Sequence, residues 1–218
     1  MTTLILATRN LHKTEEIRAI LGNGFRALCL QDFPAAPTAV EDADTFAGNA
    51  AKKAMMLADW LHATVPAGVN GEKCFVLADD SGLEVDALNG APGVHSARFA
   101  ALDSGAPGNS SDTANNAKLL RLLKEIPQDK RTARFRCVLA LAEITLSSAS
   151  REPQFFEGAC EGRIEFTPSG GGGFGYDPLF VPDGFTQSFA ELGEDVKNRL
   201  SHRARALAKF RERLQVQG

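Results

Sequence analysis

Apolar residues along this chain fall into short continuous runs and into stretches with helical spacing. Leu4 to Ala7 is a continuous apolar run, which is typical of a short strand in a sheet that is covered on both faces. Ile17, Ile20 and Leu21 then recur at helical intervals, and Gly22 follows as a plausible stop. The chain is therefore predicted to begin with a buried strand followed by an amphipathic helix.

The same alternation continues to the end of the chain. Further helices are predicted over about 45–61, over about 112–124 and from 201 onward, and further strands over 74–78, 134–144 and 155–164. Thr45, Asp112 and Ser201 are the expected N-caps of these helices. The two long strands are expected to be antiparallel, joined by a polar link at 147–153. The segments 66–71 and 101–111 are expected to be loops.

No internal repeat and no clean linker divides the sequence. Mixed helices and strands of this kind predict an α/β fold, in which the middle strands can form a second lobe. We therefore expect residues 1–218 to form a single domain made of two lobes.

Composition and charge narrow the class of protein. Hydrophobic residues make up 44% of the 218 residues, and the formal net charge is −3, so no overall positive field favours nucleic acid. The N-terminus lacks a charged region and carries a very short apolar run, unlike a signal peptide or membrane anchor. The four cysteines show no metal-binding spacing and are expected to be reduced packing residues. We expect a soluble, cytoplasmic protein with neither nucleic acid nor membrane as a partner.

The first candidate site lies between the first predicted strand and helix, at Thr8-Arg9-Asn10-Leu11-His12-Lys13. Free backbone N–H groups and the helix dipole favour an anion at such a position. Thr8 and Asn10 can donate hydrogen bonds, and Lys13 supplies a positive charge for a phosphate. The pattern is not a Walker loop. A simple polar turn with a capping residue is the alternative interpretation.

The second candidate site follows the apolar run at 74–78, where the sequence reads Asp79-Asp80-Ser81-Gly82. A carboxylate at the carboxyl end of a strand is well placed to hold Mg²⁺ or to take a proton from water. Neighbouring strand residues point to opposite faces, so Asp79 and Asp80 are not expected to serve one site equally. Glu41 can complete a metal shell or can complement a helix dipole. An Asx-turn followed by an ordinary strand is the alternative for Asp79 and Asp80.

The third and fourth candidate sites lie in the last quarter of the chain. The glycine-rich segment 170–175 leads into Tyr176 and Asp177, and Phe174 and Tyr176 offer flat surfaces on which a nucleobase can stack. The alternative is a flexible loop whose aromatic side chains fill the core. Further on, the basic residues Lys197, His202 and Arg203 can donate to purine carbonyls or phosphates, or can be solvated surface.

Taken together, these segments resemble the inosine triphosphate pyrophosphatase family, also called the XTP/dITP diphosphatases. The matching stretches occur in family order across nearly the whole chain. They are 6–13 (LATRNLHK), 46–54 (FAGNAAKKA), 78–99 (ADDSGLEVDALNGAPGVHSARF), 115–120 (NNAKLL), 133–139 (ARFRCVL), 172–180 (GGFGYDPLF) and 197–204 (KNRLSHRA).

The resemblance implies a two-lobed α/β fold with a mixed sheet, a nucleotide bound in a central cleft between the lobes, and a homodimer. It also implies Mg²⁺-dependent cleavage of non-standard purine nucleoside triphosphates, those of inosine, deoxyinosine and xanthosine, to the monophosphate and pyrophosphate. Such an enzyme cleanses the nucleotide pool and prevents incorporation of these bases into DNA and RNA.

Residue roles carry over from the resemblance by position. Asp80 is the catalytic carboxylate, acting as base or metal anchor, and Glu41 is a second acidic residue of the metal site. The implied substrate-binding residues are Thr8, Arg9, Asn10, Leu11, His12, Lys13, Ser81, Phe174, Gly175, Tyr176, Asp177, Lys197, His202 and Arg203. Donors facing a 6-keto group would be left unpaired or opposed by the amino group of adenine, which gives discrimination.

Two features depart from the family pattern. Gly48 stands where the family commonly has an acidic residue, so this helix lacks one carboxylate that could support the metal. The loops at 63–73 and 101–111 are longer than usual. Two other functions remain open on the sequence: a pyrophosphatase acting on modified pyrimidine or standard triphosphates, and a nucleotide-binding regulatory module without catalysis.

Overall fold

The structure, a computed structural model, describes residues 2–64, 74–144 and 152–215. The predicted loop at 66–71 and most of the predicted link at 147–153 lie outside these residues. Among the described residues, no helix is both long and apolar enough to cross a membrane.

A mixed six-stranded sheet has the strand order β2-β1-β3-β4-β5-β6. The strands are β1 (Thr2–Leu6), β2 (Phe25–Cys29), β3 (Cys74–Val85), β4 (Thr132–Glu143), β5 (Gln154–Ile164) and β6 (Phe180–Pro182). β1 is parallel to both β2 and β3, whereas β5 and β6 are antiparallel. The two long predicted strands correspond to β4 and β5, which are neighbours in the sheet. The predicted α/β class is therefore correct.

Six α-helices occur in the described residues: α1 (Leu11–Leu21), α2 (Phe46–Thr64), α3 (Asp112–Leu122), α4 (Phe189–Leu192), α5 (Glu194–Leu200) and α6 (His202–Gln215). Thr45 and Ser201 cap α2 and α6, since their hydroxyl oxygens accept from the backbone N–H groups of Gly48 and Ala204. The expected cap at Asp112 was wrong by one residue. Ser111 is the N-cap of α3, and Asp112 is its first helical residue.

The chain divides into two compact units. Unit 1 contains residues 1–80, 137–157 and 206–218, and unit 2 contains residues 81–136 and 158–205. The boundary in β3 falls between Asp80 and Ser81, so these adjacent residues belong to different units.

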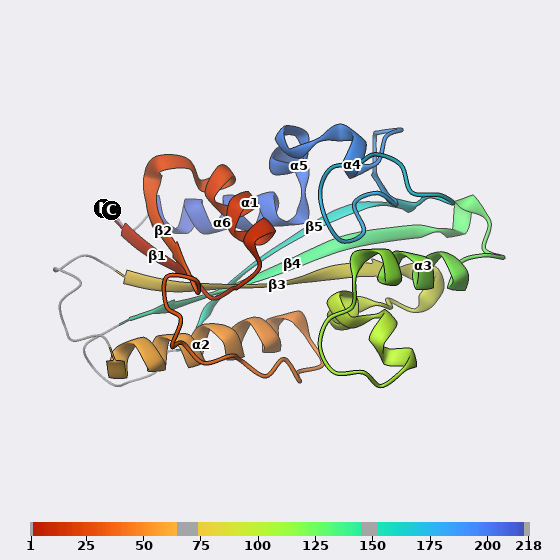
Figure 1. The fold of residues 1–218 in the computed structure, drawn as a ribbon. Helices are drawn as coiled ribbons and strands as arrows, with labels where there is room; N and C mark the ends of the chain where they lie inside the picture. The colour runs from red at the N-terminus through yellow and green to blue at the C-terminus, as the bar shows by residue number, and fades with distance from the viewer. Residues whose placement is uncertain (1, 65–73, 145–151, 216–218) are drawn as a thin grey trace. The chain divides into compact units, whose positions relative to one another are not determined.

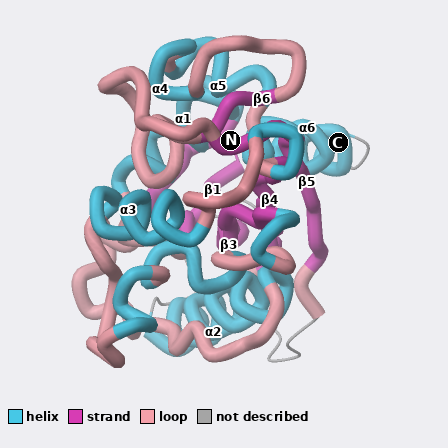
Figure 2. The backbone as a smooth tube through the Cα atoms, turned by 90° about the vertical axis from the view of Figure 1, so that its right-hand side faces the viewer, coloured by secondary structure: helices cyan, strands magenta, loops and turns pink. Residues whose placement is uncertain are grey.

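Unit 1 is built on β1, β2 and the first half of β3. In Figures 1 and 2, α2 covers one face of these strands, and α1 and α6 cover the other. Leu4 and Leu6 of β1 pack in one core with Ile17 of α1 and Phe210 of α6. Helices on both faces of β1 explain its continuous apolar run, because such a strand has no side that faces water.

Unit 2 has its own core. Leu119 of α3, Phe135 of β4, Phe180 of β6 and Phe189 of α4 belong to one buried cluster. The rings of Phe135 and Phe180 have centroids 4.7 Å apart, within the range of favourable aromatic pairs.

The four cysteines of the chain are buried free thiols, as expected of packing residues.

The expectation that the second apolar strand ends at Asp79 was wrong, as was the alternative of an Asx-turn. β3 runs without interruption from Cys74 to Val85, so both aspartates lie in the middle of a strand. Charged residues normally end a buried strand because an unpaired charge is costly to bury. Here lysines from two helices pair with Asp79 and Asp80, and the strand continues.

Candidate functional site

In unit 1, the segment 8–13 forms the turn from β1 into α1. The Thr8 hydroxyl oxygen accepts from the Asn10 backbone N–H at 3.1 Å, and Asn10 Oδ1 accepts from the Lys13 N–H at 3.1 Å. Asn10 is therefore the N-cap of α1. Arg9 Nη2 donates to the carbonyl oxygen of Ala36 at 2.8 Å. The polar turn is thus a real capping structure, and it leaves Asn10, Leu11 and His12 exposed at a helix N-terminus.

Lys13 is anchored to β3. Its Nζ lies 2.6 Å from Asp79 Oδ1, and Cys137 Sγ donates to the other oxygen of that carboxylate at 3.2 Å. Asp79 is 3% exposed. The pairing holds the Lys13 ammonium beside the first turn of α1, where the helix dipole also favours an anion.

Asp80 takes a different set of partners, as the alternation along a strand predicts. Its Oδ1 accepts from Lys53 Nζ at 2.7 Å, and its Oδ2 accepts from Asn49 Nδ2 at 3.4 Å. Lys53 also donates to the backbone carbonyl of Asp79 at 2.9 Å and lies 3.4 Å from Glu41 Oε2. The predicted pair Asp80 and Glu41 is therefore brought together around a single ammonium group.

Lys53 was not predicted as a site residue, although a signal for it exists in the sequence. Phe46, Asn49, Ala50, Ala54 and Leu57 form the buried face of α2, and Lys53 lies on the same face. A lysine is rarely buried on an apolar helix face unless it is paired. The neighbouring Lys52 points to solvent instead, with a side chain that is 48% exposed.

Burial and charge oppose each other at this cluster. Burial raises the pKa of Asp80, while the nearby Lys53 and Lys13 lower it and Glu41 raises it again; the net direction is upward. For Lys53, burial lowers the pKa, but the charges of Asp80 and Glu41 outweigh that effect and leave it raised. An additional cation would favour the ionised form of Asp80.

The donor set suits Mg²⁺ bound together with phosphates. No group of three or more His, Cys, Asp or Glu side chains able to hold a metal occurs in the described part of the chain. Mg²⁺ does not require one, because it commonly takes one or two carboxylates, water and substrate phosphate oxygens. Glu41 and Asp80 both lie within ion-pair distance of the Lys53 ammonium group, at 3.4 Å and 2.7 Å, so the two carboxylates face the same positive charge.

Gly48 does not leave open space for the missing carboxylate. A Cβ atom at this position would lie 2.8 Å from the Cβ of Ala43 and 3.1 Å from the Thr45 hydroxyl oxygen. The first turn of α2 is therefore packed around a glycine, and an acidic side chain would require the residues before the helix to move.

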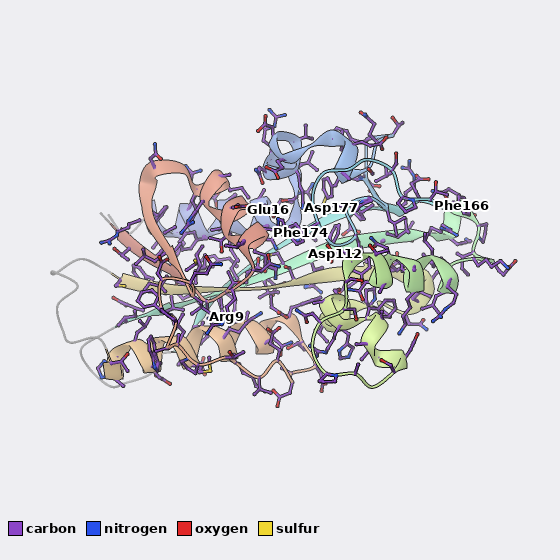
Figure 3. The ribbon with its side chains drawn as sticks, viewed as in Figure 1. Arg9, Glu16, Asp112, Phe166, Phe174 and Asp177 are labelled. Atoms are coloured by element: carbon purple, nitrogen blue, oxygen red, sulfur yellow. The ribbon has the colours of Figure 1, made fainter. Side chains whose placement is uncertain are left out.

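In unit 2, Asp177 organises the glycine-rich loop. Its Oδ2 accepts from the Phe174 backbone N–H at 2.9 Å and from Lys197 Nζ at 2.6 Å. Lys197 Nζ lies 4.4 Å from the centroid of the Phe174 ring, in cation–π contact. Gly173 has a φ of +72°, and a Cβ there would collide with the Asp177 carboxylate. Figure 3 shows Phe174 and Asp177 close to Asp112, with Phe166 at the far end of unit 2.

The two aromatic residues of this loop differ in exposure. Phe174 is half-buried, whereas Tyr176 is 4% exposed and belongs to the unit 2 core. The Tyr176 hydroxyl donates to the carbonyl oxygen of Ser96 at 2.9 Å. The geometry therefore opposes base stacking on Tyr176, whose ring fills the core as the alternative interpretation stated, and leaves Phe174 as the candidate stacking surface.

The basic residues of the last predicted site are buried, which argues against the interpretation as solvated surface. Lys197, His202 and Arg203 are 3%, 4% and 1% exposed. The His202 ring stacks on Phe135 with centroids 4.9 Å apart and an interplanar angle of 14°. Arg203 Nη2 donates to the Ser81 hydroxyl oxygen at 3.0 Å. Three buried bases near the start of α6 carry a desolvation cost that a surface cluster would not have.

Each unit thus presents a distinct kind of chemistry. Unit 1 combines two lysines with carboxylates at a helix N-terminus, which suits a metal-bound polyphosphate. Unit 2 combines an aromatic ring with buried hydrogen-bond donors, which suits a flat heterocycle that carries carbonyl oxygens.

Comparison with known proteins places the whole chain in one group. The model of the Ham1 family matches residues 4–213. The chain is 49% identical over 210 residues to a dITP/XTP pyrophosphatase of Desulforamulus reducens, covering 96% of this chain and 94% of the relative. It is 48% identical over 219 residues to one of Geobacter sulfurreducens, covering 100% and 99%.

Solved structures agree with the sequence comparisons. The Ham1 protein of Staphylococcus aureus superposes with a TM-score of 0.79 at 31% identity, covering 99% of this chain and 100% of that chain. A HAM1 protein from Coxiella burnetii gives a TM-score of 0.77 at 33% identity, covering 99% of each. From the match over nearly its full length, this chain belongs to the Ham1 family.

Proposed function

We propose that this protein hydrolyses non-standard purine nucleoside triphosphates, such as ITP, dITP and XTP, to the monophosphate and pyrophosphate. Relatives that are nearly half identical over nearly the whole chain carry the name dITP/XTP pyrophosphatase. The observation that carries the proposal is the Lys53-centred cluster of Asp80 and Glu41, 2.7 Å and 3.4 Å from the ammonium group. Lys53 lies on the buried face of α2, and Asp80 lies in β3, within the motif that resembles the family's catalytic segment.

The residues of unit 1 bind the triphosphate in this proposal. Thr8, Asn10 and Lys13 surround the N-terminus of α1, where backbone N–H groups attract phosphate oxygens. Asp80 and Glu41 would hold Mg²⁺, which neutralises charge on the phosphates. Asp80 acts either as this metal anchor or as the base that takes a proton from the attacking water. Lys53 keeps the Asp80 carboxylate oriented and lies within reach of further negative charge.

The residues of unit 2 bind the purine base. Phe174 offers a ring face, and Lys197, His202 and Arg203 supply donors for the keto groups of hypoxanthine or xanthine. Adenine presents an amino group at the same position, which would oppose a donor and leave it unpaired. A site of buried donors can therefore discriminate strongly against ATP. Gly175, Asp177 and Ser81 complete the proposed base-side residues. Tyr176 supports them from the core, where its hydroxyl donates to the carbonyl oxygen of Ser96 at 2.9 Å.

The test is pyrophosphate release from ITP, XTP, GTP, ATP and dTTP, with Mg²⁺ and with excess EDTA. We expect ITP and XTP to be cleaved far faster than the other three and all release to stop with EDTA. Equal turnover of dTTP and ITP would contradict the purine assignment. The variant Asp80→Asn should abolish release and still bind ITP; unchanged turnover of this variant would contradict the role of Asp80.

The proposal includes a homodimer acting in the cytoplasm. Light scattering of the purified chain and fractionation of cells that express it measure these two properties directly. A monomer of full activity would contradict the proposed dimer without affecting the proposed reaction.

A further inference from the structure

One residue of the glycine-rich loop in unit 2, Gly175, is hydrogen-bonded through both its backbone N–H and its carbonyl oxygen to a single helix. The backbone N–H of Gly175 donates to Asp112 Oδ2 at 2.7 Å, and the carbonyl oxygen of Gly175 accepts from Asn116 Nδ2 at 3.0 Å. Asp112 and Asn116 are four residues apart in α3 and so lie on the same face of that helix. Neither residue belongs to the sites described above.

Capping of α3 does not account for these two side chains. The side-chain cap of α3 is Ser111, whose hydroxyl oxygen accepts from the Ala114 N–H at 3.2 Å. Asn116 is 9% exposed, and its Oδ1 atom has no hydrogen-bond partner among the described residues. A buried amide that leaves one atom unpaired is a poor choice for packing alone. The Nδ2 atom of Asn116, in contrast, donates to the carbonyl oxygen of Gly175.

Gly175 adjoins the candidate stacking surface. Gly175 has a φ of +64°, a left-handed conformation that suits glycine, and it separates Phe174 from the buried Tyr176. The backbone N–H of Phe174 donates to the Asp177 carboxylate, and the Phe174 ring is in cation–π contact with Lys197. The next residue, Gly175, is hydrogen-bonded to Asp112 and Asn116 of α3. These contacts together fix the backbone from which the Phe174 ring projects.

We propose that Asp112 and Asn116 are positioning residues that set the orientation of Phe174 toward the base of the substrate. This inference rests on the proposed function, because it assigns Phe174 to the base. It predicts that loss of either side chain weakens base recognition, whereas the phosphate chemistry of unit 1 remains. The effect should appear in KM for ITP and in the selectivity for ITP over ATP, rather than in kcat.

The kinetic test compares Asp112→Ala and Asn116→Asp with Asp112→Asn and a control, Asp129→Ala. Asp129 is an exposed carboxylate of the same unit, and its ion-pair partner is the neighbouring Lys130 at 3.8 Å. Asp112→Asn keeps an acceptor oxygen but loses the charge, so it separates the hydrogen bond from an effect on the helix dipole.

We expect Asp112→Ala and Asn116→Asp to raise KM for ITP about tenfold, as loss of one hydrogen bond can do, with kcat changed less than about threefold. Asp112→Asn and Asp129→Ala should stay within about threefold of the parent in both constants. Equal loss in Asp112→Asn and Asp112→Ala would overturn the positioning role in favour of a charge effect. Parental KM and selectivity in Asp112→Ala and Asn116→Asp would overturn it outright.

A second measurement needs no substrate. Tyr176 is the only tyrosine in the chain, so incorporation of 3-fluorotyrosine gives a single ¹⁹F resonance next to Gly175. Asp112→Ala and Asn116→Asp should shift or broaden this resonance, and Asp129→Ala should not. A resonance unchanged in both variants would overturn the proposed role of the Asp112 and Asn116 hydrogen bonds to Gly175, even if either variant proved too unstable for kinetics. A parent chain that cleaves no triphosphate would overturn the proposed function, whereas an active parent with unaffected variants would overturn the positioning role alone.

Discussion

Lys53 Nζ lies 2.7 Å from Asp80 Oδ1, and both side chains are nearly buried, with 11% and 9% exposure. The same ammonium group donates to the carbonyl oxygen of Asp79 at 2.9 Å. One lysine of α2 thus holds both the backbone and a side chain of adjacent residues in β3. Together with the Lys13 ammonium group, 2.6 Å from Asp79 Oδ1, this relationship explains how a strand can carry two successive aspartates through the interior of unit 1.

Replacing Lys53 should affect both stability and catalysis. Lys53→Met leaves Asp80 buried without its nearest cation, a change that costs about 3 kcal/mol in the free energy of unfolding. We also expect pyrophosphate release from ITP to fall at least ~100-fold, because the carboxylate loses its orientation. Urea unfolding and steady-state kinetics measure the two effects.

The adjacent Lys52 provides the control for that experiment. Its side chain is 48% exposed and pairs with Asp42 on the surface, so Lys52→Met should change stability by less than about 1 kcal/mol. Equal losses in the two variants would show that the burial of Lys53 is irrelevant to its role.

Replacing Asp177 should disturb the base end of the proposed site. Its carboxylate and Lys197 Nζ are 2.6 Å apart, with side chains 2% and 4% exposed. Asp177→Asn removes the negative charge beside the buried Lys197 ammonium group and should destabilise unit 2 by about 3 kcal/mol. The selectivity for ITP over ATP should fall about tenfold. Asp183→Asn, at an exposed position, should alter neither, and retained selectivity in Asp177→Asn would remove Asp177 from the proposed base site.

Arg131 should contribute to stability alone. Its guanidinium group donates to the carbonyl oxygens of Leu123, Ile126 and Glu165 at 2.6, 3.0 and 3.1 Å, and the residue is 1% exposed. Lysine cannot reproduce this planar fork of donors. Arg131→Lys should therefore lower the free energy of unfolding by about 2 kcal/mol, with kcat and KM of the folded fraction unchanged. Thermal melting and kinetics at a temperature below the transition check both statements.

Asp103 should give a pH-dependent contribution to stability. Lys118 donates to its carboxylate at 2.6 Å and Arg121 at 2.7 Å, and these contacts lower the pKa of Asp103 from its ordinary value of 3.8. A carboxyl group whose pKa is lower in the folded state stabilises the protein above the unfolded pKa, and this contribution is lost as the pH falls through the folded pKa.

Asp103→Asn should accordingly be less stable than the parent at neutral pH, and the difference should shrink as the pH falls below 3.8. Urea unfolding of both proteins at about pH 7 and about pH 3 measures this change. A stability difference that stays constant between these two pH values would contradict the ion-pair explanation.

Local patterns in the sequence were sufficient for much of the secondary structure. The caps at Thr45 and Ser201 and the stop at Gly22 depend on residues within one helical turn, so they need no contact with distant parts of the chain. Lys13, Asp80 and Asp177 were singled out from the sequence as candidate site residues, because they lie in the motifs that resemble the family.

Local patterns in the sequence could not predict contacts between residues that are far apart in the chain. Lys53 and Asp80 are separated by 27 positions, and Tyr176 and Ser96 by 80. Whether a lysine is buried or solvated, and whether a tyrosine ring faces a ligand or the core, depends on which helix covers which strand. The continuation of β3 through Asp79 and Asp80 has the same origin, since lysines from α1 and α2 pair with these carboxylates.

The sequence by itself determined the class of fold, the helix caps at Thr45 and Ser201 and the family, because each of these is encoded in neighbouring residues or in the order of motifs. Tertiary structure alone decided that Lys53 joins the acidic cluster and that Asp112 and Asn116 hold Gly175. The physical reason is that a charge or a hydrogen-bonding group is committed only when folding removes water and leaves one partner within reach.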